Sequence, residues 1–250
     1  MSANPAWPRG YALKTFDVID STNEEAKRLA LASEPGPIWI SAARQTAGRG
    51  RRGRAWESPT GNLAATLMLR PSRPAGDCAQ LSFAAAVAAC DTLRDFAPNA
   101  EIRVKWPNDV LAARAKIAGI LLESSGPAGE VPAWLAIGIG INLATHPEGT
   151  EYPATSLKAL GVAVPPPEDA LLHLAAHFAR WYEVWRGEGF PGVRDAWLAR
   201  AAGLGARIRA RLATGETGGV FEGIDETGAL ILRETADSVR HIAAGEVFFA

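Results

Sequence analysis

A run of glycine and arginine residues lies at Gly48–Arg54, GRGRRGR, and Trp56 follows it. Arginine carries a fixed positive charge, and its forked donors match the geometry of carboxylate and phosphate groups. Glycines leave the backbone of such a loop with many accessible conformations. The mixture predicts a mobile cationic loop that closes over an anionic ligand, with Trp56 as part of an apolar lid. A merely solvated basic loop is the less favoured interpretation, because this mixture serves neither a core nor a simple turn.

The first six of these residues, GRGRRG, also satisfy the dinucleotide-binding pattern G-x-G-x-x-G. That pattern requires a helix directly after the glycines, because the helix N-terminus holds the pyrophosphate. Here Pro59 and Gly61 follow, and then a predicted strand. Arginines between the glycines would also crowd a close approach of the backbone to phosphate. We therefore interpret the match as accidental, and the sequence contains no Walker P-loop pattern.

A second motif covers residues 105–123, KWPNDVLAARAKIAGILLE. Pro107 bends the chain after a strand and presents Asn108 and Asp109 at a corner. Lys116 begins the next strand, and Gly119 permits the close approach of a ligand. A lone lysine at the start of a strand would normally be just exposed. Next to this corner, Lys116 is a candidate for binding an anion.

The charge of the whole chain is nearly balanced, with 26 Lys and Arg against 27 Asp and Glu. Nucleic-acid-binding proteins usually carry a clear positive excess, so the arginine run is a local concentration that counts against such a function without excluding it. The sequence has no apolar run of about 18 residues that could span a membrane. Residues 1–16 lack the apolar region of a secretory signal.

The two cysteines, Cys78 and Cys90, lie in one predicted apolar helix and are expected to be buried, which makes a reducing cytoplasm the simplest setting. His173 and His177 are four residues apart on another predicted helix. For this pair a surface or packing position is favoured over a metal site. The histidines show no zinc-like grouping with the cysteines: His146, His173, His177 and His241.

The elements that must position these motifs follow from hydrophobic patterning and turn residues. We expect strands at Thr15–Ile19, Pro37–Ala43, Asn62–Leu69, Glu101–Trp106, Val110–Ala112, Lys116–Glu123 and, in a central position, Pro132–Leu143. We expect helices at Ser21–Ser33, Asp77–Phe96, Glu168–Arg186 and Val193–Ala202. Strands outnumber helices and many are joined by short turns, which predicts a mixed α+β fold rather than regular βαβ alternation.

The pattern changes after Gly203. Four short segments, RIRARLA, GVFEGID, ALILRE and EVFF, are predicted strands separated by turns. The expected organisation is therefore a catalytic domain over residues 1–204 and a small C-terminal β-barrel over residues 205–250.

Five motifs together carry a family resemblance: DSTN at 20–23, GRGRRGRAW after Gln45, KWPND at 105–109, KIAGIL at 116–121 and GIGIN at 138–142. In this order and spacing the chain resembles the biotin protein ligase family over about residues 16–145. The resemblance implies a class II synthetase-like catalytic domain, with a mixed, mostly antiparallel sheet and helices, followed by a small β-barrel. Too few residues precede the first strand for the DNA-binding helix-turn-helix of the family's regulatory members, so the resemblance is to the non-repressor type.

The activity implied by the resemblance is a two-step ligation. Biotin and ATP first give biotinyl-5'-AMP and pyrophosphate, with Mg²⁺ sharing the phosphate charge, and a lysine of a biotin carboxyl carrier protein then takes the biotinyl group. The carrier domain would belong to acetyl-CoA carboxylase or a related biotin-dependent carboxylase. A cytoplasmic monomer or homodimer is expected, with neither DNA nor a membrane as partner.

Site residues are carried over from the matching motifs. Biotin is expected to contact Ser21, Thr22, Asn23, Gln45, Arg49, Gly50, Arg51, Lys116 and Gly119. ATP and the adenylate are expected to contact Arg51, Arg54, Trp56, Asn108, Lys116 and Asn142. Catalysis is assigned to Lys116, Arg51 and Asp109, and no protein ligand is assigned to a metal.

Three of these residues have competing interpretations. Ser21 is also a good helix N-cap, and with Glu24 it has capping-box spacing, while Glu24 and Arg28 are spaced for an ion pair. Asn142 could simply end a strand. Asp109 could orient the acceptor lysine, deprotonate it or bind metal.

Two other functions compete with biotin ligation. A lipoate–protein ligase shares the architecture and the acyl-adenylate chemistry, and the GRGRRG block favours biotin over lipoate. A nucleic-acid-binding module would use the arginine loop and the small barrel, but the near-neutral charge and the lack of base-stacking aromatic motifs count against it.

Overall fold

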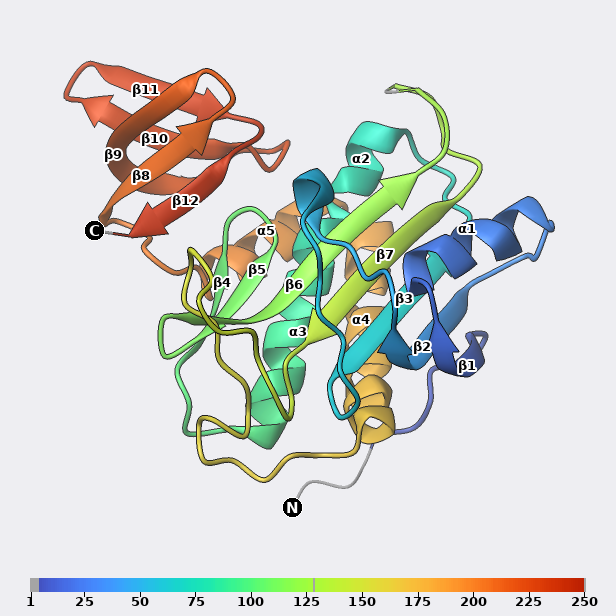
Figure 1. Ribbon diagram of the computed structural model, residues 1–250. Coiled ribbons are helices and arrows are strands. Elements are labelled where there is room, and N and C mark those ends of the chain that lie inside the picture. The colour runs from blue at the N-terminus through green and yellow to red at the C-terminus, as the bar shows by residue number, and fades with distance from the viewer. Residues whose placement is uncertain (1–4, 128, 250) are drawn as a thin grey trace.

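The computed structural model of the protein describes residues 5–127 and 129–249, which form two β-sheets and a set of helices (Figure 1). The strand order of the larger sheet is β1-β2-β3-β7-β6-β5-β4. Its strands are β1 (Ala12–Ile19), β2 (Ile38–Gln45), β3 (Leu63–Leu69), β4 (Ile102–Lys105), β5 (Asp109–Ala112), β6 (Ala115–Ser124) and β7 (Leu135–Ile141). All seven expected strands are present, with ends shifted by at most three residues, and β7 is central as predicted.

The pairing in this sheet is mostly antiparallel. Only β1 and β2 are parallel, and α1 (Thr22–Leu31) makes the crossover that a parallel pair requires. The other neighbours are joined by antiparallel ladders. The predicted mixed, mostly antiparallel α+β fold is therefore confirmed.

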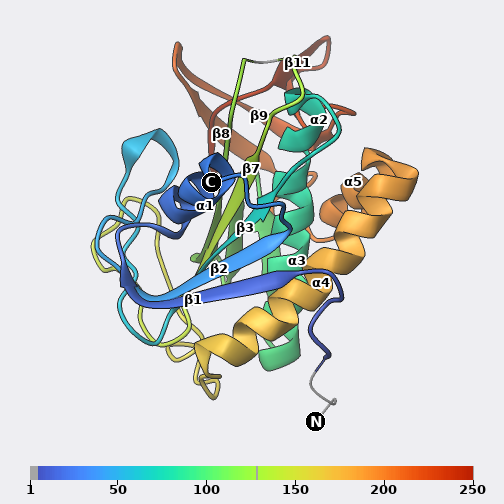
Figure 2. The same ribbon diagram turned by 90° about the vertical axis from the view of Figure 1, so that its right-hand side faces the viewer.

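Helices cover both faces of the sheet unequally. Figure 2 shows α3 (Leu81–Phe96), α4 (Pro167–Glu188) and α5 (Phe190–Leu198) on one side and α1 on the other. Alternation along β2 explains the division: Trp39 packs against Phe178 of α4, whereas Ile38 and Ile40 belong to the small cluster beneath α1. Successive side chains of β2 thus point to opposite faces of the sheet, and each face packs against its own hydrophobic cluster.

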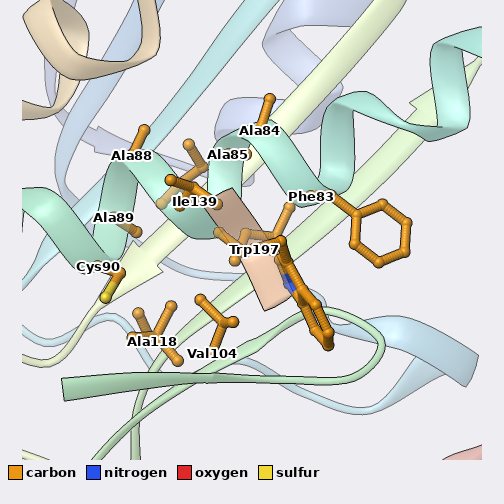
Figure 3. Packing of buried hydrophobic residues seen from close by; sticks show 14 of the residues in the cluster. Phe83, Ala84, Ala85, Ala88, Ala89, Cys90, Val104, Ala118, Ile139 and Trp197 are labelled. Atoms are coloured by element: carbon orange, nitrogen blue, oxygen red, sulfur yellow. The ribbon is translucent and has the colours of Figure 1, made fainter. Parts of the chain in front are cut away.

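The main core is built on the alanine-rich α3. Ala84, Ala85, Ala88 and Ala89 are fully buried in the packing around Ile139 of the central strand (Figure 3). Small side chains let the helix approach the sheet closely, which places the strand ends behind the candidate site in fixed positions.

The predicted single helix Asp77–Phe96 is two helices, α2 (Ala75–Ala79) and α3, with Gln80 between them. At this junction the Gln80 amide donates to the Asp77 carbonyl, and the Phe83 amide donates to the Gln80 carbonyl. Both bonds span three residues, so the hydrogen-bond ladder tightens there. Cys78 in α2 and Cys90 in α3 are buried and free, as expected.

The C-terminal part is a five-stranded antiparallel sheet in the order β11-β10-β9-β8-β12. Its strands are β8 (Arg207–Leu212), β9 (Gly215–Ile224), β10 (Leu230–Thr235), β11 (Ser238–Ile242) and β12 (Glu246–Phe249). The sequence predicted four of them. The edge strand β11 was missed because its side chains are mostly exposed and carry no apolar alternation.

This smaller sheet packs directly on the larger part of the chain. The indole nitrogen of Trp106 donates to the Gly228 carbonyl at 3.0 Å, and Trp197 of α5 makes an edge contact with Phe221 of β9. The smaller sheet therefore lies against the end of β4 that precedes the KWPND corner. Within residues 5–127 and 129–249, no helix combines the length and apolar character needed to cross a lipid bilayer.

Candidate active site

One cavity of about 380 Å³ lies between the larger sheet, the glycine–arginine loop, the KWPND corner and strand β12 of the smaller sheet. This volume is in the range of small-molecule sites, about 300–1,000 Å³. Every residue carried over from the sequence motifs lines it: Ser21, Thr22, Asn23, Gln45, Arg49, Gly50, Arg51, Arg54, Trp56, Asn108, Asp109, Lys116, Gly119 and Asn142. The fold therefore brings together residues that are far apart in the sequence.

A neutral hydrogen-bond network lies at the α1 end of the cavity. The backbone amide and the hydroxyl of Thr22 lie 2.8 Å and 3.0 Å from the side-chain oxygen of Gln45, whose amide donates to Ser58 at 2.8 Å. The hydroxyl of buried Thr66 lies 2.6 Å from the amide oxygen of Asn23 and 2.8 Å from the Thr22 hydroxyl. Since each hydroxyl has one proton, Thr66 donates to either Asn23 or Thr22 at any moment, and Thr22 donates to either Gln45 or Thr66.

Thr66 and Ser58 were missed by the sequence analysis. Thr66 lies in the middle of β3 and is completely buried, so its only sequence signal was a polar residue inside an apolar strand. The Asn23 amide also donates to Glu123 at 2.7 Å. These contacts fix the orientation of the DSTN side chains before any ligand is present.

The predicted N-cap position of Ser21 is confirmed, but the predicted capping box with Glu24 is wrong. Ser21 is the N-cap residue of α1, but its side chain makes no capping hydrogen bond, and its amide donates to Asp20 at 2.7 Å. Glu24 bonds Arg49 of the loop instead of closing a capping box. The Ser21 hydroxyl is therefore not committed to the helix and lies at the cavity wall.

The expected Glu24–Arg28 pair is also wrong. Arg28 holds Asp20 through two hydrogen bonds of 2.8 Å and 2.9 Å and bonds Glu25 at 2.6 Å. The hydrogen bonds from Arg28 lower the pKa of Asp20 to about 2. Arg28 thus holds Asp20, which lies in the turn that leads into α1. Ser21 follows Asp20 in this turn.

The KWPND corner places a carboxylate between two lysines. Asp109 lies 2.6 Å from the Lys116 amine on one oxygen and 3.8 Å from the Lys105 amine on the other. Lys105 is 5% exposed, and its amine lies 3.6 Å from the centroid of the Tyr152 ring. Burial lowers the pKa of Lys105, and Asp109 opposes this effect. Lys105 was missed although it begins the KWPND motif itself.

Asn108 ties the corner to the loop and to the sheet. Its amide donates to the Ile120 carbonyl of β6 at 2.6 Å, and its side-chain oxygen accepts from Arg51 at 3.1 Å. Burial and the nearby Arg52 lower the pKa of Arg51, yet a guanidinium remains charged at neutral pH. Arg51 is therefore held at the corner within reach of the Lys116–Asp109 pair.

The glycine–arginine loop is a short irregular hairpin. The Trp56 amide donates to the Gly48 carbonyl at 2.9 Å, and the Gly50 amide donates to the Arg54 carbonyl at 2.7 Å. A single 3₁₀ turn at Arg51–Gly53 closes it, and no α-helix follows. This agrees with the expectation that the dinucleotide pattern is accidental.

The two outer arginines anchor this hairpin on opposite sides. Arg49 bonds Glu24 at 2.5 Å and lies 3.4 Å from Glu123. Arg54 bonds Glu246 of the smaller sheet at 2.8 Å. These pairs are partly exposed, so each contributes modestly to stability, but together they fix the position of the loop over the cavity.

Trp56 lies on the cavity wall against glycines. A Cβ atom at Gly140 of β7 would overlap the indole ring, and one at Gly119 of β6 would lie 3.1 Å from it. The Lys116 amine lies 5.6 Å from the same ring. The glycines of the GIGIN and KIAGIL motifs therefore make room for Trp56 beside the cationic centre.

Asn142 is both a strand-end residue and part of the cavity lining. It is 2% exposed, and its side-chain amide donates to the Thr155 carbonyl at 3.0 Å. Its backbone amide donates to the Ile117 carbonyl at 2.8 Å. These bonds hold the segment around Thr155 beside the end of β6.

The smaller sheet supplies part of the wall through Glu246, Val247 and Phe248. No sequence motif pointed to these residues. The carboxylates of the lining are paired with cations: Asp109 with Lys116, Glu246 with Arg54, and Glu151 with Arg211 at 2.7 Å. The cavity therefore offers a cationic surface and no ready-made cluster of carboxylates for a resident metal within the described residues.

Comparisons with known proteins agree with this geometry. Residues 15–142 match the family described as the biotin/lipoate A/B protein ligase family, and residues 203–250 match the biotin protein ligase C-terminal domain. A biotin–[acetyl-CoA-carboxylase] ligase of Paracoccus denitrificans is 51% identical, over 92% of this chain and 97% of that protein.

More distant relatives extend the likeness. The bifunctional ligase/repressor BirA of Bacillus subtilis is 34% identical, over 95% of this chain and 74% of that protein. A solved biotin protein ligase from Aquifex aeolicus, in complex with biotin and ATP, superposes with a TM-score of 0.80 at 26% identity, over 95% of this chain and 97% of that one.

Proposed function

Because the chain belongs to the biotin protein ligase family, we propose that it activates biotin with ATP and transfers the biotinyl group to a carrier-protein lysine. The observation that carries this proposal is the gathering of every site residue assigned from the motifs around one cavity, with the Lys116–Asp109 pair in its wall. The activity is that of a biotin–[biotin carboxyl-carrier protein] ligase, which forms a carbon–nitrogen bond and converts ATP to AMP and pyrophosphate.

In the first step a carboxylate oxygen of biotin attacks the α-phosphorus of ATP, and pyrophosphate leaves. Two anions must meet, and negative charge builds on the phosphoryl oxygens. Lys116 and Arg51 supply fixed positive charge beside each other, held by Asp109 and Asn108. Preorganised cations of this kind stabilise the transition state more than the separated substrates.

The other end of biotin is a neutral ureido ring, which requires donors and acceptors rather than charge. We assign it to the network of Ser21, Thr22 and Gln45, with Asn23 at its edge. The support is that this network lies at the neutral end of the cavity and that the Ser21 hydroxyl makes no capping hydrogen bond. Gly50 and Gly119 also line the cavity, and we assign them to the biotin side of it.

The nucleotide is assigned to the side of the cavity bounded by Trp56, Asn108 and Asn142. Arg54 stands at its rim, and Trp56 offers an aromatic face beside Lys116. Asn108 and Asn142 already donate their amide protons to carbonyls of the chain. Their contribution to adenine recognition is therefore to shape the pocket and hold its walls, with the remaining amide hydrogens available to the base.

In the second step the ε-amine of the acceptor lysine attacks the carbonyl carbon of biotinyl-5'-AMP, and AMP leaves. The amine must lose a proton, since its ordinary pKa is about 10.4. Asp109 is the carboxylate at the centre of the site, and we assign it to orienting the amine and accepting the proton. Lys116 and Lys105 contact its two oxygens and hold the carboxylate in position.

Mg²⁺ is proposed to enter with the nucleotide. It prefers to bind phosphate oxygens and water with few protein ligands, and the lining carboxylates here are already paired with cations. It would share the charge of the phosphates during the first step. No step depends on a protein-bound ion.

The acceptor is proposed to be the biotin carboxyl carrier domain of acetyl-CoA carboxylase or a related carboxylase, in the cytoplasm. The support is the Paracoccus denitrificans relative and the two free, buried cysteines, which suit a reducing compartment. The protein would act as a monomer or homodimer, without DNA as a partner.

We also propose that the chain divides at residues 1–204 and 205–250. The support is that α5 ends at Leu198, β8 begins at Arg207, and no strand is shared between the two sheets. The smaller domain completes the cavity through Glu246 and Phe248 rather than forming a separate site.

The direct test is to incubate the protein with ATP, Mg²⁺ and biotin, with lipoate in a parallel reaction, and to analyse the products by mass spectrometry. Biotinyl-5'-AMP, followed by a mass increase on an added carrier domain, supports the proposal. Lipoyl-adenylate alone would replace it with a lipoate–protein ligase. Neither product from folded protein, together with salt-sensitive binding of DNA or RNA, would favour a nucleic-acid-binding module.

A further inference from the structure

A cluster of three metal-ligating side chains lies on the helical side of the protein, outside the cavity. Asp95 of α3 accepts hydrogen bonds from Nδ1 of His173 at 2.7 Å and from Nε2 of His177 at 2.8 Å, both on α4. The three facing atoms lie within 4.8 Å of one another. None of the three residues lines the cavity of the active site.

Helix geometry and helix packing build this cluster. Residues four apart in a helix lie on one face, so His173 and His177 project together from α4. Asp95 is in the last turn of α3, which packs along α4. The sequence showed the histidine pair, but only the packing of the two helices brings the carboxylate to it.

The cluster is held firmly on one side and open on the other. The His173 side chain is 8% exposed, and its ring lies 4.8 Å from that of Phe96. The His177 and Asp95 side chains are 24% and 33% exposed. Two imidazoles and a carboxylate thus converge at a point that water can reach.

The arginines near this cluster pair with Asp91 and not with Asp95. Asp91, one turn before Asp95, bonds Arg180 and Arg200. Within the part of the chain that the structure describes, the ion-pair partners of Asp95 are the two histidines. Burial tends to raise the pKa of Asp95, but the hydrogen bonds from His177 and His173 outweigh it and lower that pKa.

We propose that Asp95, His173 and His177 form a binding site for one divalent transition-metal ion, with Zn²⁺ as the best match. Two imidazole nitrogens, one carboxylate oxygen and one water complete the tetrahedral set that zinc takes. Ligand atoms around such an ion lie about 3.3 Å apart, from bond lengths of about 2.0–2.1 Å. Small side-chain movements therefore convert the hydrogen-bonded cluster into a coordinated one.

Proton balance is simple. Each ring nitrogen that faces Asp95 loses its proton to water before it coordinates the metal. A neutral ring takes a proton from water on its other nitrogen, so no net proton is released, whereas a charged ring already carries that proton and releases one to solvent. Asp95 coordinates as the carboxylate. The ion would tie the last turn of α3 to α4, so its binding stabilises the folded state, and the stabilisation grows with the logarithm of the metal concentration above Kd.

The test uses tag-free protein that has been treated with a chelator and then titrated with Zn²⁺ by calorimetry, without nucleotide. One ion per chain is expected, with a rise in unfolding temperature, and Co²⁺ should give the intense visible absorption of a tetrahedral site. His177→Ala and Asp95→Asn should each weaken binding at least about tenfold. Synthesis of adenylate by both variants checks that they fold.

The matched control is His241→Ala. His241 forms the same kind of bond, to Asp225 at 2.7 Å, but without a second histidine. This variant should bind Zn²⁺ like the wild type. Unchanged affinity in Asp95→Asn would reduce the site to a two-histidine surface chelate and overturn the proposal, as would unchanged affinity in His177→Ala or the absence of one-to-one binding by the wild type.

Discussion

Lys116 and Asp109 form an ion pair of 2.6 Å between two neighbouring antiparallel strands, β6 and β5. The second oxygen of Asp109 faces Lys105, which is almost fully buried. The pair is therefore held by the sheet and not by flexible loop residues. The cation proposed for the first chemical step and the carboxylate proposed for the second therefore share one rigid position.

Lys116→Ala should strongly reduce formation of biotinyl-5'-AMP, by about 10²–10³ in rate, because one of two positive charges at the developing phosphoryl charge is lost. The measurement is biotin-dependent release of pyrophosphate. Lys158→Ala, which removes an exposed lysine outside the cavity, is the control and should be unaffected. Synthesis near the wild-type rate would remove Lys116 from its assigned role.

Arg51→Gly should keep the fold but release the adenylate early, because the loop loses its hydrogen bond to Asn108 and its contact with the phosphate. Free adenylate acylates exposed lysines, so biotinylation of an added bystander protein should rise. Arg52→Gly is the matched control, since Arg52 is exposed and does not bond the corner. The account fails if bystander labelling by Arg51→Gly stays at the wild-type level.

Gly140→Ala should impair both steps by displacing Trp56, because the new methyl group would overlap the indole ring. Since the neighbouring strands are rigid, the ring must move. Ligand-dependent quenching of tryptophan fluorescence and adenylate synthesis should both fall. Gly76→Ala is the control, because a Cβ there meets no atom within 4 Å. Normal activity in Gly140→Ala would show that the position of Trp56 is unimportant.

Asp225→Asn should lower the stability of the smaller sheet at neutral pH. Burial tends to raise the pKa of Asp225, but hydrogen bonds from His241, Thr227 and Ala229 outweigh it and lower it to about 2. A lowered carboxyl pKa means that the folded state binds the proton less well than the unfolded chain. The stabilisation, at most about 2.5 kcal/mol, is then present above pH 4 and is lost as the pH falls toward 2.

The measurement is urea unfolding of wild type and Asp225→Asn at pH 7 and at pH 2.5. The difference between the two proteins should be largest at pH 7 and should shrink in acid. Glu222→Gln, which breaks an exposed pair with Arg233 in the same sheet, should change stability little at either pH. A difference that persists undiminished in acid would contradict the assignment to the Asp225 carboxylate.

The sequence predicted the strands of the larger sheet well because each has an apolar run bounded by turn residues. The sequence did not predict elements whose existence or ends depend on contacts with other parts of the fold. Strand β11 has exposed side chains and exists because β10 lies beside it. The helix break at Gln80 follows a local tightening of hydrogen bonds that residue types do not encode.

The site followed the same division. Motif residues such as Thr22 and Lys116 were recoverable because their types suit the chemistry and their spacing matches a family. Thr66 and Glu246 were not recoverable, because nothing in the sequence shows which residues they contact. In the structure Thr66 contacts Asn23, and Glu246 pairs with Arg54. The Asp95 cluster was missed because its carboxylate lies on another helix.

The cavity wall runs from Ser21 to Phe248, so its first and last contributors are separated by almost the whole sequence. On the ribosome, the residues of α1 and the arginine loop emerge long before β12 is made. Until then the nascent chain lacks the part of the cavity wall that Glu246, Val247 and Phe248 supply. The cavity is therefore complete only when nearly the whole chain has been translated.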